Sequence, residues 1–107
     1  MNGWHYLLLA SLFELGFVTS LKLSEQFTRL WPTLSMLVLG GISLWFLTRA
    51  MQDISLGTAY AVWTGIGAFG TAIIGILFFK DPIAFWRLFF LFTLIASIVG
   101  LRFVAGE

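Results

Sequence analysis

The charged residues of this chain are few and gathered in short clusters, and this distribution limits the folds open to it. Of its 107 residues, 10% are charged and 60% are hydrophobic, whereas a soluble domain carries roughly 25% charged residues. The clusters separate four apolar stretches, each close to the roughly 20 residues that cross a bilayer. We therefore predict an all-α membrane protein, a single four-helix transmembrane domain filling residues 1–107, with spans at residues 3–21, 32–48, 56–79 and 83–104.

Composition and charge exclude several classes of protein. The formal net charge is +1, so the chain offers no basic surface to a nucleic-acid partner. It contains no cysteine, which removes disulfides and thiolate metal ligands, and we expect no metal site and no cofactor. The first stretch lacks a basic leading region and a small-residue cleavage motif, so we expect a retained helix rather than a signal peptide.

The basic residues give a weak signal of orientation. Lys22, Arg29, Lys80 and Arg87 fall on one predicted side of the membrane, and Arg49 and Arg102 on the other. Positive residues favour the cytoplasmic side, but a bias of this size permits insertion in both orientations.

One carboxylate, that of Glu14, falls within an otherwise uncharged apolar stretch. An acid near the centre of a membrane helix costs roughly 2.5–3.5 kcal/mol to insert, and such residues usually face a cavity or a partner and handle an ion or a proton. Ala10 and Phe17 share its helix face, and Ser11 flanks it. We predict that this face lines a pocket in which Glu14 handles an ion, a proton or a cationic ligand. Ordinary helix packing is the alternative for Ala10 and Ser11.

The third stretch combines aromatic residues with glycines, in the run GTAYAVWTGIGAFG over residues 57–70. Tyr60 and Trp63 lie three residues apart and project together from one helix face. Gly65 and Gly67 follow at once and weaken the helix against bending, which predicts a hinge. The letters GxGxxG also match the dinucleotide fingerprint, but no strand precedes them, so we reject a nucleotide site.

The remaining stretches contribute small residues. Ser43 is predicted to line the pocket and to orient the carboxylate, with plain packing as its alternative. Ala96 and Gly100 lie four residues apart with Ser97 between them, a pattern that supports close helix packing in lipid. We predict that these three residues form a dimer contact, although packing within one subunit would use the same pattern. No nucleophile–base pair accompanies the buried acid, so we do not expect an enzyme.

Taken together, these features resemble the small multidrug resistance family. The length, the four spans, the glutamate of the first span, FTRLWP after it and GTAYAVWTGIG in the third span match in order. The resemblance implies an antiparallel, dual-topology dimer that exchanges protons for cations. By position it assigns proton and substrate binding to Glu14, pocket lining to Tyr60 and Trp63, a place near the glutamate to Ser43, and flexibility to Gly65 and Gly67.

Within that family the chain is more similar to guanidinium exporters than to exporters of bulky cations. AVWTGIGA, FFKDP and VGLR carry this similarity. Two residues depart from it: Phe17 stands where guanidinium exporters typically have tryptophan, and Ser11 where they typically have glycine. Phe17 keeps an aromatic wall but has no indole N–H, which leaves room for broader substrates.

These observations lead to one expected function and two alternatives. We expect a proton-coupled antiporter of the bacterial inner membrane that exports guanidinium and small guanidinyl cations by alternating access. The first alternative is a broad-specificity exporter of quaternary ammonium and lipophilic cations, and the second is a non-transporting membrane scaffold subunit. The expected partners are the small cation, protons, the lipid bilayer and a second copy in a homodimer, with a heterodimer of paralogous chains as the alternative.

Overall fold

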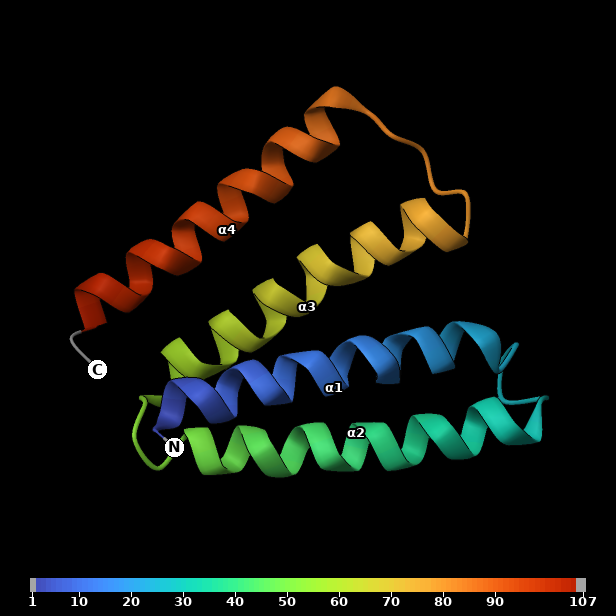
Figure 1. Ribbon diagram of the computed structural model, residues 1–107, viewed down its shortest axis with the longest axis horizontal. Coiled ribbons are helices and arrows are strands. Elements are labelled where there is room, and N and C mark those ends of the chain that lie inside the picture. The colour runs from blue at the N-terminus through green and yellow to red at the C-terminus, as the bar shows by residue number, and fades with distance from the viewer. Residues whose placement is uncertain (1, 106–107) are drawn as a thin grey trace.

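The computed structural model describes residues 2–105 and contains four α-helices: α1 (Gly3–Leu23), α2 (Leu30–Ala50), α3 (Leu56–Phe78) and α4 (Phe85–Ala105). All four are long and apolar enough to cross a membrane, which confirms the prediction of an all-α chain with four spans. Successive helices run in opposite directions, so the start of α1 and the end of α4 lie at the same end of the molecule (Figure 1).

The helix α1 begins where a side chain can cap it. The side-chain oxygen of Asn2 accepts hydrogen bonds from the backbone N–H groups of Trp4 (3.0 Å) and His5 (3.1 Å), which have no acceptor within the helix. At the other end, the Ser24 hydroxyl donates to the Leu21 carbonyl (2.7 Å). Both ends of α1 are therefore fixed by local polar groups.

The start of α4 differs from the prediction. The helix begins at Phe85, two residues later than expected, because the preceding loop folds back on α3. The backbone N–H of Asp81 donates to the Gly75 carbonyl (3.0 Å), and Arg87 donates to the Pro82 carbonyl (2.9 Å). These bonds hold Pro82 outside the helix.

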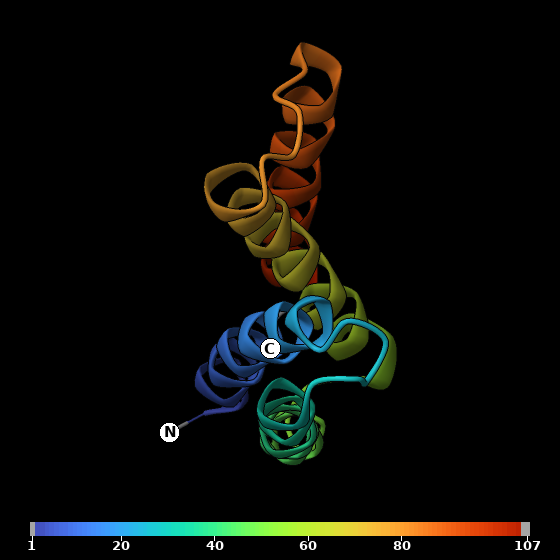
Figure 2. The same ribbon diagram turned by 90° about the vertical axis from the view of Figure 1, so that its right-hand side faces the viewer.

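The helices pack side by side in the order α2, α1, α3, α4. The helix α1 lies along α2, α3 packs on the other flank of α1, and α4 lies beyond α3 (Figure 2). Among the described helices, α4 packs closely only against α3. The core is built from small and medium apolar side chains such as Ala10, Ala59 and Val62, all at most 2% exposed. The large apolar side chains mostly point outward, as expected where lipid surrounds the protein.

Candidate functional site

The Glu14 carboxylate lies against the backbone of α3. A Cβ atom added to Gly67 would collide with the Glu14 side chain, with both oxygens and the Cδ carbon inside contact distance. The Glu14 Oε1 atom is buried and has no hydrogen-bond partner among residues 2–105. A buried polar atom normally has such a partner, and an exception requires an explanation. The predicted acid is therefore placed between α1 and α3 with one oxygen left unpaired.

The predicted aromatic pair stands on the same face of α3, beginning one turn from the carboxylate. Trp63 precedes Gly67 by four residues and Tyr60 precedes Trp63 by three, spacings that place all three on one face. The rings of Tyr60 and Trp63 have centroids 5.9 Å apart and are tilted by 44°. The Tyr60 side chain is 56% exposed, so the pair extends from the helix interface to the surface of the chain.

Ser43 joins three helices through its hydroxyl group. It donates to the Ala10 carbonyl on α1 (2.6 Å) and accepts from the indole N–H of Trp63 on α3 (3.0 Å). The sequence predicted that Ser43 would orient the Glu14 carboxylate. In the structure its hydrogen bonds go to Ala10 and Trp63, so it orients the indole ring.

A groove of about 490 Å³ runs between α1, α2 and α3. Its lining includes three predicted pocket residues, Phe17, Ser43 and Trp63. The Phe17 ring rests on Gly40 of α2, with ring carbons 2.9 and 3.2 Å from the position that a Cβ would take there. The structure therefore brings together an aromatic residue from α1, the α2 serine and the α3 tryptophan, and Glu14 is not among the described residues that line this groove.

The other predicted pocket and hinge residues lie inside helix contacts. Ala10 and Ser11 are fully buried, and the Ser11 hydroxyl donates to the Leu7 carbonyl of its own helix (2.9 Å). A Cβ on Gly65 would collide with Ile98 of α4. The helix α3 continues without a break through Gly65 and Gly67, and the predicted hinge stays a prediction.

The residues predicted for a dimer contact lie on the free side of α4. Ala96, Ser97 and Gly100 are exposed, and nothing lies within 4 Å of a Cβ built on Gly100. This face is open to a neighbour, and its use in a dimer stays a prediction.

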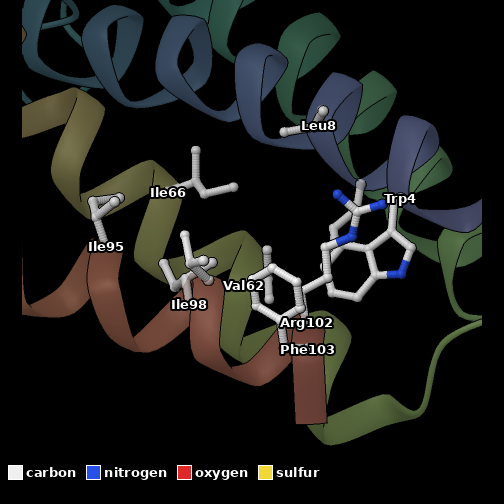
Figure 3. A pocket seen from close by; sticks show the side chains of 10 residues that line it. Trp4, Leu8, Val62, Ile66, Ile95, Ile98, Arg102 and Phe103 are labelled. Atoms are coloured by element: carbon white, nitrogen blue, oxygen red, sulfur yellow. The ribbon is translucent and has the colours of Figure 1, made fainter. Parts of the chain in front are cut away.

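A second groove, of about 670 Å³, lies between α1, α3 and α4 (Figure 3). Its walls are mostly apolar, including Val62, Ile66 and Ile98. Its one charged residue is Arg102, whose guanidinium lies 5.2 Å from the centre of the Trp4 ring. A groove that presents an arginine and no carboxylate does not suit a cation, so its size does not make it the functional site.

Potential metal-ligating side chains are not clustered in the described part of the chain. No three His, Cys, Asp or Glu side chains within it are grouped so that they could hold a metal ion. The site chemistry rests on one acid, its glycine neighbour and the aromatic groups near it.

The contacts that two glycines make in the site were not predicted from the sequence. The Glu14 carboxylate packs against Gly67, and the Phe17 ring packs against Gly40. A signal for Gly67 was present, because it lies one helical turn after Trp63 on the predicted pocket face. No comparable signal marked Gly40, since the rotation of α2 relative to α1 is not readable from its uniformly apolar sequence.

Four apolar helices with a single mid-span acid, half-buried between α1 and α3, define a small multi-pass membrane protein. Residues 2–95 match the family described as Small Multidrug Resistance protein, and the chain belongs to this family. Guanidinium exporters from Yersinia pseudotuberculosis and Proteus vulgaris are 42% and 40% identical to it over 100 residues, each alignment covering 94% of this chain and 96% of the relative. An uncharacterised membrane protein of Bacillus subtilis, YvaE, is 38% identical over 102 residues, covering 95% of this chain and 86% of the relative.

Membership confirms several predictions. The chain is a transporter and not an enzyme, and it is a multi-pass protein of the bacterial inner membrane. The resemblance drawn from the sequence is likewise confirmed.

Proposed function

We propose that this protein exports guanidinium and small guanidinyl cations in exchange for protons, by alternating access within a dimer. The observation that carries the proposal is the Glu14 carboxylate, which lies mid-span against Gly67 with Oε1 unpaired. An acid in this position is costly in a membrane and satisfies no structural hydrogen bond through that oxygen. Its unused acceptor is available to a proton or to a cationic N–H donor.

The geometry of guanidinium suits this acid. A planar guanidinium can donate two parallel hydrogen bonds to one carboxylate. The relatives named guanidinium exporters support the same class of substrate. In the proposed dimer, two Glu14 carboxylates face one cavity and titrate as a coupled pair, so the arriving cation displaces protons and returning protons displace the cation.

The aromatic pair supplies the second contact to the cation. The indole N–H of Trp63 donates a hydrogen bond to the Ser43 hydroxyl, which fixes the ring. Tyr60 and Trp63 would close over the cation and attract it through their faces. In this proposal Ser43 acts through Trp63 rather than through the carboxylate.

Phe17 supports a second candidate, a broader range of quaternary ammonium cations. Its ring lines the groove beside Trp63 and lies on Gly40. A phenyl ring offers an apolar wall without a polar N–H, and such a wall accepts an alkyl group as readily as a guanidinium edge. We therefore propose guanidinium as a substrate and quaternary ammonium cations as a second class of substrate that experiment must test.

A non-transporting scaffold subunit is the alternative of another class. It would account for four packed helices and for the open face of α4. It would not require an acid that costs insertion energy and pairs with no group through Oε1. The family assignment also favours transport.

The first experiment compares the wild-type protein with Glu14→Gln after reconstitution into liposomes. We expect the substitution to abolish proton-coupled currents on solid-supported membranes, because an amide cannot exchange a proton or bind a cation as a carboxylate does. Glu25→Gln is the matched control, since Glu25 lies exposed in the loop between α1 and α2 and should leave the currents unchanged. Substantial proton-driven uptake by Glu14→Gln would contradict the mechanism.

The substrate range is tested with two cations on the wild-type protein. Currents with guanidinium alone would support a guanidinium exporter, and currents with guanidinium and tetrapropylammonium would support a broad cation antiporter. If neither cation gives a current, co-reconstitution with a paralogous chain separates a heterodimer, which gains current, from a scaffold, which does not.

A further inference from the structure

Gly67 differs from its neighbours Gly65 and Gly70 in what lies against it. Gly75, whose added Cβ would meet the Asp81 carboxylate, faces the loop before α4 and not Glu14. A Cβ on Gly65 would meet Ile98, and a Cβ on Gly70 would meet Leu15, in each case an apolar side chain. At Gly67 the neighbour is the Glu14 carboxyl group, with Oε2 2.8 Å from the added Cβ and Oε1 and Cδ closer still. Gly67 is therefore the described α3 glycine that contacts the functional acid.

Backbone freedom does not explain this glycine. Gly67 lies in the interior of a continuous helix, and its φ angle is outside the left-handed region that favours glycine. In a helix interior, glycine is less favourable than alanine by about 0.8–1.0 kcal/mol. A glycine here has a disadvantage for the helix, and the close approach of the carboxylate is the feature that alanine could not reproduce.

We propose that Gly67 is a positioning residue for Glu14. Its missing side chain lets the carboxylate rest directly on α3, one turn from Trp63, so that the acid and the indole ring can act on the same cation. This inference rests on the proposed function, because it assigns the position of the acid that binds protons and substrate. It is distinct from a hinge, which would require glycine for bending rather than for space.

The direct test is Gly67→Ala, which places a methyl group where the carboxylate lies. We expect guanidinium binding to weaken about tenfold or more, equivalent to 1.4 kcal/mol, because the carboxylate must leave its position against Gly67. We also expect a changed pH midpoint for proton release on guanidinium addition. A purely structural role would not move that midpoint.

Gly70→Ala is the matched control. It adds the same methyl group to the same helix, one turn or less away, against the flexible Leu15 side chain on α1. We expect it to leave the pH midpoint unchanged. Equal shifts for Gly67→Ala and Gly70→Ala would overturn the proposal, because general crowding between α1 and α3 would then explain both.

A compensating variant separates position from packing. Aspartate is one methylene shorter than glutamate, so Glu14→Asp retracts the carboxylate from α3. We expect the double variant, Glu14→Asp with Gly67→Ala, to bind guanidinium better than the product of the two single effects predicts. Additive losses would overturn the proposal.

These variants also distinguish a variant that fails to fold from a failure of the proposed transport function. If Gly67→Ala does not fold but the double variant does, the result supports a clash between the alanine methyl group and the Glu14 carboxylate. If neither variant folds, Gly67 is needed only for helix packing and the proposal fails. If the wild-type protein releases no protons to guanidinium, the proposed function fails. The position of the acid is then followed by ¹³C NMR of the Glu14 carboxyl group during a pH titration, where a changed midpoint in Gly67→Ala and not in Gly70→Ala still supports the positioning role.

Discussion

The helix α1 has two packed flanks, and they are built differently. Toward α2, it pairs polar groups and stacks rings: Ser43 bonds to the Ala10 carbonyl, and the Phe13 and Phe46 rings stack with centroids 5.7 Å apart. Toward α3, Glu14 and Leu15 rest on glycines, as Phe17 does toward α2, but Glu14 keeps one oxygen without a partner.

The difference indicates a division of roles between the flanks. Polar groups that are satisfied within the protein hold helices together, whereas an unsatisfied polar atom is available to a ligand. The α2 flank is accordingly expected to respond to mutation mainly in stability, except where Gly40 contacts Phe17 in the groove lining, and the α3 flank mainly in binding. The variants below test this division, from the largest expected effect to the smallest.

Ser43→Ala is expected to have the largest effect on stability, because it removes both hydrogen bonds of the Ser43 hydroxyl. Hydrogen bonds between membrane helices contribute on average about 0.6 kcal/mol each and at most about 1.7, so we expect a loss of about 1–2 kcal/mol in the free energy of unfolding. Unfolding with sodium dodecyl sulfate in mixed micelles measures it. Guanidinium binding should also weaken as the indole ring loses its acceptor.

The control for that variant is Thr48→Ala. The Thr48 hydroxyl is exposed and donates to the Trp45 carbonyl of its own helix (2.7 Å), so its loss breaks no contact between helices. An equal destabilisation by the two variants would show that the Ser43 bridge has no special role in joining α1, α2 and α3.

Gly40→Ala is expected to change the choice of substrate on the α2 side of the groove. The new methyl group would lie 2.9 Å from a Phe17 ring carbon, so the ring must shift into the groove. We expect tetrapropylammonium to lose about 10-fold in affinity relative to guanidinium, at the low end of the effect that one methyl group has in an apolar pocket. Gly41→Ala provides the comparison, because nothing lies within 4 Å of its Cβ; equal losses for both cations with Gly40→Ala would contradict the role of Phe17.

Ser35→Ala is expected to have the smallest effect. The Ser20 and Ser35 hydroxyl oxygens lie 3.1 Å apart and link α1 to α2 near one end. Breaking this bond should cost about 0.6 kcal/mol of unfolding free energy and leave transport rates unchanged. A strong loss of transport in this variant would mean that the two flanks of α1 do not divide the roles as described.

Much of the fold could be predicted because a bilayer reduces the choices. A stretch of about 20 uncharged residues has few alternatives to a spanning helix, and the four helices begin and end close to the charge clusters. The start of α4 was predicted two residues too early, since the bonds from Asp81 to Gly75 and from Arg87 to Pro82 depend on how the loop folds. How the helices pack was not predictable, because lipid-facing and core-facing positions are equally apolar.

The candidate site divides in the same way. Glu14 could be recognised because an acid in a span is costly, and Tyr60 with Trp63 because their spacing puts both on one face. Which group contacts which depends on the rotation of each helix, and so the partners of Ser43 and the neighbours of Gly67 and Gly40 required the structure. The hydrophobic pattern carries little information about rotation when every face is apolar.

The contact between Gly67 and Glu14 also limits how this protein can change over generations. Every other amino acid has a Cβ atom, so position 67 has no conservative replacement and cannot drift through similar residues. Gly41 and Gly57 have open space where a Cβ would be and are free to vary by the same criterion. A lineage that moves the carboxylate would have to alter positions 14 and 67 together, which makes the pair, rather than either residue, the unit on which selection acts.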